Sequence, residues 1–112
     1  MATTKIEGGK PFSLRGMVAK QEGSIVSRIL LQDETGTLTV FAFDAGQALS
    51  EHTVPFNAFI EVIEGEAVIT VGGKPSTVKE GEIILMPGGV PHKVDAVRDF
   101  KMLLIMFKTP KT

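Results

Sequence analysis

The side chains of this sequence most suited to chemistry are its two histidines, His52 and His92. Both lie in segments rich in glycine and proline: Gly46 precedes His52, and Pro91 directly precedes His92. An imidazole can ligate a transition metal or carry a proton near neutral pH. If the strands that carry the two rings face one interior, the rings meet there, and both kinds of chemistry are open.

The chain contains no cysteine, which excludes a disulfide framework and a thiolate metal site. Any metal ion would need histidine, carboxylate, amide or water ligands. The sequence therefore leaves the cofactor unknown, with a divalent transition metal as the one candidate.

The elements that must position these histidines are strands. Apolar and polar residues alternate with a period of two in segments rich in Thr, Val and Phe, which is typical of strands. Gly72 and Gly73 indicate a tight hairpin, and residues 33–36 indicate a turn. Residues 45–51 are the best helix candidate, but the segment is short and contains Gly46. The expected strands cover residues 16–20, 24–32, 37–44, 51–54, 58–63, 66–71, 76–79, 83–86, 91–97 and 100–108.

The two glycine-rich segments resemble the two motifs of the RmlC-like cupin superfamily, G-x5-H-x-H-x3-E-x6-G and G-x5-P-x-G-x2-H-x3-N. The matching residues are Gly46, His52 and Gly65 in the first motif, and Gly81, Pro87, Gly89 and His92 in the second. This resemblance, over about residues 37–108, implies an all-β, double-stranded β-helix, the jelly-roll barrel of a small single-domain cupin. We expect a flexible arm at 1–15, the barrel at 16–108 and a tail at 109–112.

The sequence also departs from the pattern of metal-binding cupins, in which three histidines and one glutamate hold the ion. Val54 stands at the second histidine position, and Ala58 stands at the glutamate position. Ala96 replaces the asparagine that closes the second motif. The resemblance thus implies a degenerate metal motif, with His52 and His92 as the remaining candidate ligands. Two imidazoles alone rarely hold a divalent ion tightly, because exchangeable waters fill the other positions.

Strand alternation predicts which residues line the barrel beside the histidines. On the last strand we assign the methionine-bearing face to the interior, since methionine is common on adaptable binding surfaces. The resulting site is mostly apolar with two imidazoles, as in many small-molecule sites. The predicted ligand-binding residues are His52, Val54, Ala58, Ile60, Val62, His92, Met102, Leu104 and Met106.

Three functions follow, and the sequence does not establish whether the protein is an enzyme. The first is binding of a small molecule in the barrel around the two histidines. The second is a metal-dependent dioxygenase or isomerase with an incomplete ligand set. The third is metal-free acid–base catalysis, which ranks last because the chain has no tyrosine to complete a proton relay. Alternatively, both histidines are ordinary core residues.

The remaining expectations concern partners and location. Net charge is −1 with no basic block, which argues against a nucleic-acid partner. We find no apolar run of membrane-spanning length and no signal-peptide core, so we predict a cytoplasmic protein without a membrane partner. Small cupins are often homodimers, and residues 29–31 and 100–107 are apolar on both faces. A partner subunit would cover the second face; alternatively, the opposite sheet or the N-terminal arm covers it.

Overall fold

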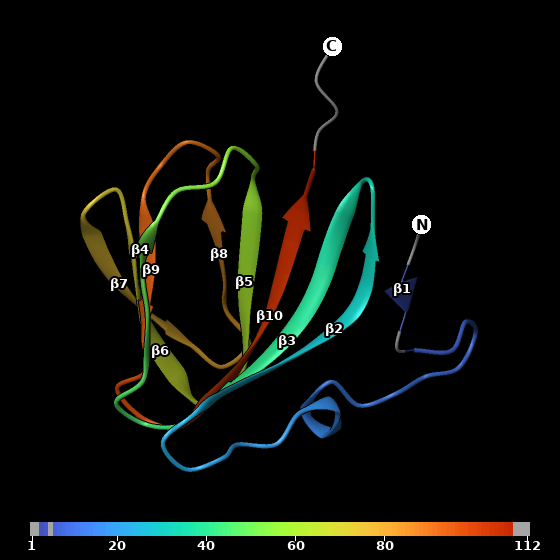
Figure 1. Cartoon of the computed structure of the whole chain (residues 1–112). Helices are drawn as coiled ribbons and strands as arrows, with labels where there is room; N and C mark the ends of the chain where they lie inside the picture. The colour runs from blue at the N-terminus through green and yellow to red at the C-terminus, as the bar shows by residue number, and fades with distance from the viewer. Residues whose placement is uncertain (1–2, 5, 109–112) are drawn as a thin grey trace.

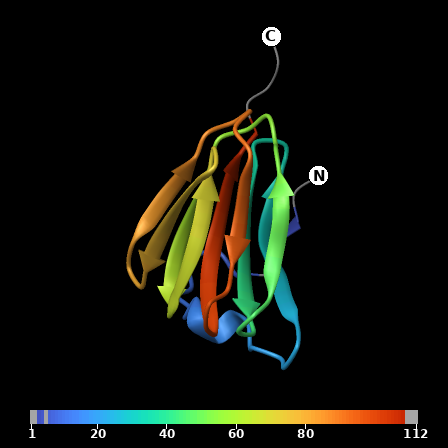
Figure 2. The ribbon, with the colours of Figure 1, turned by 90° about the vertical axis from the view of Figure 1, so that its left-hand side faces the viewer.

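A computed structural model describes residues 3–4 and 6–108 of the chain. Two antiparallel sheets face each other and enclose one interior (Figures 1 and 2). The all-β prediction is confirmed, and the predicted tail at 109–112 lies outside the described residues. The six-stranded sheet has the order β1 (Thr3–Thr4), β2 (Ile25–Asp33), β3 (Gly36–Phe43), β10 (Phe100–Phe107), β5 (Ala58–Glu64), β8 (Ile83–Met86). The four-stranded sheet has the order β4 (Ala48–His52), β9 (His92–Asp95), β6 (Glu66–Val71), β7 (Lys74–Lys79).

Two local predictions were wrong. The strand expected at 16–20 is absent, and the short 3₁₀ helix η1 (Arg15–Met17) lies there instead. Its turn is closed by the Gly16 and Met17 amides, which donate to backbone carbonyls three residues earlier. The strand expected at 51–54 is β4, which begins at Ala48 and ends at His52. Gly46 turns the chain early with a φ of 89°, so the helix candidate is mostly strand.

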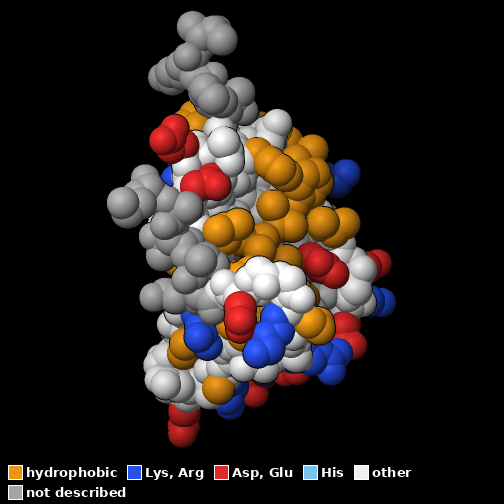
Figure 3. All heavy atoms as spheres, turned by 90° about the vertical axis from the view of Figure 1, so that its right-hand side faces the viewer, with side chains coloured by type: hydrophobic (Ala, Val, Ile, Leu, Met, Phe, Trp, Pro, Cys, Tyr) orange, Lys and Arg blue, Asp and Glu red, His pale blue; other side chains and the backbone are white. Residues whose placement is uncertain are grey.

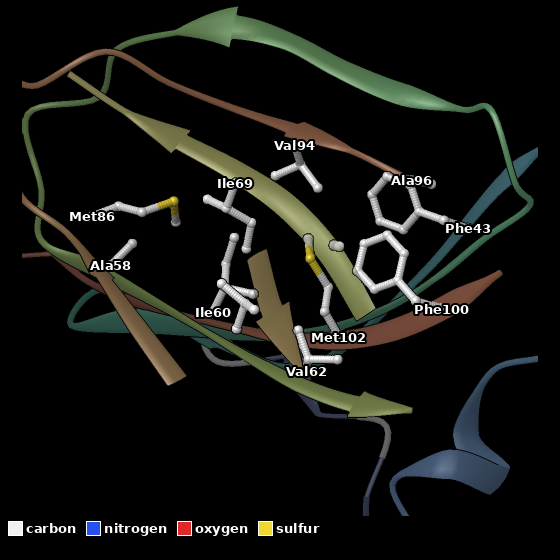
Figure 4. Packing of buried hydrophobic residues seen from close by; sticks show 12 residues of the cluster. Phe43, Ala58, Ile60, Val62, Ile69, Met86, Val94, Ala96, Phe100 and Met102 are labelled. Carbon is white, nitrogen blue, oxygen red and sulfur yellow. The ribbon is translucent and has the colours of Figure 1, made fainter. Parts of the chain in front are cut away.

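One hydrophobic core runs through the space between the sheets, with its aromatic residues at one end. Phe43 and Phe100 stack there with ring centroids 4.5 Å apart, and both side chains are fully buried. Val62 and Met102 pack beside them, whereas Met86 lies toward the other end (Figure 4). Large aromatic rings therefore close one end of the barrel, and smaller or flexible side chains line the other.

The N-terminal segment covers part of the outer face of the six-stranded sheet. Ile6 and Leu14 pack against a second apolar cluster that contains Leu30 and Val40. Arg15 fixes the segment, since its Nη2 donates to Glu80 Oε2 at 3.0 Å. The N-terminal arm thus covers this part of the second apolar face of the sheet, which is one of the two alternatives that we drew from the sequence. The predicted domain boundaries and arm flexibility stay predictions.

The rest of that outer face is uncovered in the single chain. Ile83 and Leu85 of β8 and Phe107 of β10 are 56%, 45% and 51% exposed. Figure 3 shows hydrophobic side chains gathered on this side of the molecule. Neighbouring Phe59 meets Phe107 edge to face at 6.2 Å. Apolar patches of this kind mark interaction surfaces more often than isolated exposed residues do.

Within the described ranges, no helix is both long and apolar enough to cross a membrane. The predicted cytoplasmic location stays a prediction.

Candidate functional site

The two histidines lie opposite each other on neighbouring strands. β4 pairs with β9 in antiparallel fashion, and the register places His52 across from His92. Their Nε2 atoms are 3.2 Å apart, and the rings meet edge to face with centroids 4.3 Å apart. A register shift between Leu49 and His52 lets both side chains turn inward while the intervening residues stay exposed. Two residues that are forty positions apart in the sequence are thus in direct contact.

The loops beside the histidines are fastened to each other. The Gly89 amide donates to the Val54 carbonyl at 2.8 Å, and the Gly88 amide donates to Asn57 Oδ1 at 2.9 Å. A Cβ atom on Gly88 would lie 2.7 Å from the Pro55 carbonyl oxygen, so only glycine fits this crossing. The glycine-rich motif therefore positions the strand ends that carry the imidazoles.

The neighbouring carbonyl assigns the proton of the outer ring, His52. His52 Nδ1 lies 2.9 Å from the Ser50 carbonyl oxygen, so it carries a proton and donates there. His52 Nε2 is then an acceptor and takes a hydrogen bond from His92 in the tautomer of His92 that is protonated at Nε2. The other ring nitrogen of His92, Nδ1, is buried and makes no hydrogen bond of ordinary geometry within the described part of the chain, although the nearby Val90 backbone favours a proton on the ring. An unpaired buried nitrogen is costly to stability, which makes it a feature that a ligand can relieve.

The protonation of His92 is also perturbed. Burial lowers the pKa of His92 below its ordinary value, and the neighbouring His52 lowers it further, against a smaller opposing effect of the Val90 backbone. The side chain is only 5% exposed, whereas His52 is exposed at the rim of the site. The neutral form of His92 is therefore favoured, and the pair presents an inner and an outer imidazole.

A cavity of about 210 Å³ opens beside this pair. Its floor is buried and comes from Ala58, Ile60, Met86, Val94 and Met102. Its rim is partly exposed and includes His52. The full lining comprises Phe41, Leu49, His52, Val54, Ala58, Ile60, Met86, His92, Val94, Met102, Leu104 and Met106.

Eight of the nine predicted site residues lie around this cavity: His52, Val54, Ala58, Ile60, His92, Met102, Leu104 and Met106. Val62 does not line it. Alternation correctly turns Val62 inward, but it lies toward the end that Phe43 and Phe100 fill, so it packs in the core.

Sequence reasoning missed Phe41, Leu49 and Met86 as lining residues. Phe41 belongs to a strand with apolar residues on both faces, so alternation alone could not choose its inner face. Leu49 was placed in a helix candidate rather than in a strand. Met86 alternates with Ile84 on β8, and this signal was available. Val94 also lines the cavity, two residues after His92 on the same face of β9.

The donor set does not fit a tightly bound metal ion. Two nitrogens 3.2 Å apart could share one ion, but catalytic zinc sites use three protein ligands and structural sites use four. The positions that would supply further ligands hold Val54 and Ala58, which have no donor atom. Over residues 3–4 and 6–108, no group of three or more histidine, cysteine or acidic side chains is placed to hold an ion.

Among the described residues, the lining holds no ionisable side chain besides the two imidazoles. Every lining residue in the described chain except the two histidines is apolar. Glu51 neighbours His52 in sequence but is exposed and does not line the cavity. The arrangement is therefore suited to binding an apolar molecule with one polar end.

Comparisons with known proteins agree with this geometry. The sequence profile of the Cupin domain family matches residues 39–107, which run from within β3 to the end of β10 and include both histidines. The uncharacterized protein SCO3923 of Streptomyces coelicolor is 28% identical over 82 residues, which are 73% of this chain and 78% of that protein.

Two solved structures are similar in sequence as well as in fold. A conserved protein of unknown function from Streptococcus pyogenes, SPY1581, is 36% identical with a TM-score of 0.88 and covers 95% of this chain and 93% of its own. A Cupin 2 conserved barrel domain protein from Leptotrichia buccalis is 41% identical with a TM-score of 0.84. That match covers 87% of this chain but only 47% of the Leptotrichia protein.

Proposed function

This chain belongs to the cupin domain family, and from that premise we propose that it binds a small molecule in the cavity beside His52 and His92. The observation that carries the proposal is the contrast between the apolar lining and the two adjoining imidazoles. A concave, mostly apolar cavity with few, convergent polar groups is the usual form of a small-molecule site. The unpaired Nδ1 of His92 adds support, because burial without a partner lowers stability unless a ligand compensates.

Filling the entrance of the cavity should weaken this binding. Val54 is half-buried at the rim, so Val54→Phe fills the entrance without enlarging a fully buried core position. We expect its affinity for any cavity ligand to fall at least about tenfold, which is ~1.4 kcal/mol. Isothermal titration calorimetry with a small aromatic probe such as phenylacetamide measures this.

Val97→Phe is the matched control, since Val97 is exposed on a loop and does not line the cavity. It should bind the probe like the unmodified protein. Equal affinity in all three proteins would place the binding site elsewhere and reject the proposal.

The second candidate function is a metal-dependent enzyme of the dioxygenase or isomerase type. The one observation in its favour is the 3.2 Å separation of the two Nε2 atoms, which suits two ligands of a single ion. We rank it second because the other ligand positions are aliphatic. Elemental analysis of untagged protein, beside the His52→Ala/His92→Ala variant, should show no stoichiometric metal in either. A stoichiometric metal lost only in the variant would reverse the ranking.

We also propose that a second copy of the chain covers the exposed outer face of the six-stranded sheet. A shallow groove at the β2, β3 and β10 side is lined by Leu31, Leu38, Ile105 and Phe107. On the other edge of this sheet, Ile83 and Leu85 project from β8. In a two-fold symmetric interface each patch meets its counterpart, so the β8 ridge of one copy enters the groove of the other. The ridge and the groove lie on the same face of the sheet, so two copies of this face are complementary to each other.

Leu85→Glu should convert this dimer to a monomer, because each of the two copies would place one carboxylate in the apolar interface. Light scattering after size-exclusion chromatography should give twice the 12.0 kDa chain mass for the unmodified protein and 12.0 kDa for the variant. Val97→Glu, exposed elsewhere, should stay dimeric. An unmodified protein that is monomeric at every concentration contradicts the proposal, as does a Leu85→Glu dimer.

A further inference from the structure

The cavity limits the size of its ligand. An apolar cavity of about 150 Å³ accommodates benzene, so about 210 Å³ accommodates a molecule of roughly eight to ten non-hydrogen atoms. Cavities for drug-sized ligands are larger, from about 300 Å³ upward. The part of the ligand that lies inside the cavity is therefore a single ring or a short chain with one small substituent.

The apolar wall favours a ring. Met86 of β8 and Met102 and Met106 of β10 contribute three thioethers to the lining, and Phe41 of β3 adds an aromatic side chain. Methionine sulfur makes favourable contacts with aromatic rings at about 5 Å, and its flexible side chain adapts to a flat ligand. Aromatic side chains also pack favourably against a ligand ring by offset stacking or edge-to-face contact.

The polar end of the ligand must lie against β4 and β9. The only polar side chains in the lining, considering the described residues, are His52 and His92. The strands β3, β5, β8 and β10 contribute only apolar residues to it. On β9, Lys93 and Asp95 alternate with His92 and Val94 and so point to the opposite face. No carboxylate in this lining could balance a cationic ligand, and burying an unpaired cation is costly.

An acidic oxygen group suits the imidazole pair best. A phenol can give its proton to the pair, whereas a carboxylic acid is already ionised near neutral pH and binds together with a proton that the pair takes up from water. In both cases the ligand oxygen then accepts a hydrogen bond from an imidazolium N–H. Hydrogen bonds between ionised partners are roughly twice as strong as neutral ones. A neutral amide can still make a hydrogen bond there but gains no such charge assistance.

We infer that the ligand is a compact aromatic acid, a carboxylic acid or phenol, whose ring lies against the methionine side chains and whose acidic oxygen bonds to the His52–His92 pair. This inference rests on the proposed function, since it names the ligand class of the same cavity.

Three probes with one skeleton test it. Phenylacetic acid, phenylacetamide and phenethylamine share a ring and a near-equal size but are acidic, neutral and cationic. In calorimetric titrations near neutral pH, the acid should bind at least about tenfold more tightly than the amide, and the amine should not bind. In His92→Leu, which removes the pair, the affinities of acid and amide should become similar.

The outcomes separate the inference from the proposed function. Equal affinity for acid and amide, or tightest binding of the amine, overturns the inference and leaves the cavity as a binding site. An acid preference that persists in His92→Leu also overturns it, because the acid would then bind elsewhere. If none of the probes binds but toluene does, the inference fails alone. If toluene also fails to bind, the proposed function fails with it.

Discussion

Replacing Phe100 by alanine should lower the free energy of unfolding by about 3–5 kcal/mol. Phe100 is 1% exposed and stacks on Phe43 at the closed end of the barrel, with an interplanar angle of 20°. Truncation removes the transfer energy of the ring and leaves a cavity that the rigid strands cannot fill by collapse. Since domains of this size have a total stability of about 5–15 kcal/mol, this single change consumes a large part of it.

Urea denaturation followed by circular dichroism measures the effect. Phe12→Ala is the control, since Phe12 is 44% exposed on the N-terminal segment, and it should change stability by no more than about 0.5 kcal/mol. If Phe100→Ala proves too unstable to purify, Phe100→Leu retains part of the volume and should show a smaller loss. Similar stability of the Phe100 and Phe12 variants would contradict the packing described.

The second large effect is expected from His92→Leu, which should lose the preference for acids yet raise stability. The substitution removes the unpaired Nδ1 from a buried position. Unsatisfied buried polar groups cost about 1–3 kcal/mol, so we expect a gain near the lower end of that range. His52 is exposed, and water can replace its lost partner. A residue that lowers stability but supports binding is typical of functional sites.

This gain should grow as the pH falls. In the unfolded chain His92 titrates near its ordinary pKa of about 6.5, whereas burial and His52 lower its pKa in the folded state. Below about pH 6.5 the unfolded chain therefore takes up a proton that the folded state binds less readily. The unmodified protein loses this stability as the pH falls from about 6.5 toward the lower folded-state pKa, and His92→Leu does not.

Urea denaturation at pH 7.5 and at pH 5.5 measures both parts of this prediction. The stability difference between His92→Leu and the unmodified protein should be larger at the lower pH. Val97→Leu is the control, since Val97 is exposed on a loop away from the pair, and its stability difference from the unmodified protein should not change between the two pH values. A His92→Leu variant that is less stable than the unmodified protein at both pH values would identify His92 as a well-satisfied core residue.

The strands and the histidine pair could be predicted because local patterns determine them. Period-two alternation located most strands, and two glycine-rich motifs with fixed spacing brought His52 and His92 to one place. Gly88 illustrates the physical basis, because its backbone crosses Pro55 too closely for any side chain. At such positions the residue type alone indicates the structural requirement, here a close approach of two backbone segments.

The remaining features depend on contacts between distant segments. The position of Val62 in the core was set by Phe43 and Phe100, which fill one end of the barrel, and no local pattern locates that end. The inner face of β3 could not be chosen from Phe41 alone, because both faces of that strand are apolar. The β4 boundaries depended on Gly46, whose amide bonds to the Ala96 carbonyl at 2.7 Å across the chain.

The most direct test of the cavity as a ligand site uses its methionines as reporters. Met86, Met102 and Met106 line the cavity, whereas Met17 packs beneath the N-terminal segment, outside it. Protein labelled with carbon-13 at the methionine methyl groups would be titrated with phenylacetic acid and followed by NMR. We predict saturable shifts of the Met86, Met102 and Met106 methyl signals with little change at Met17. No shift at these three signals, or a shift confined to Met17, would contradict a ligand site beside His52 and His92.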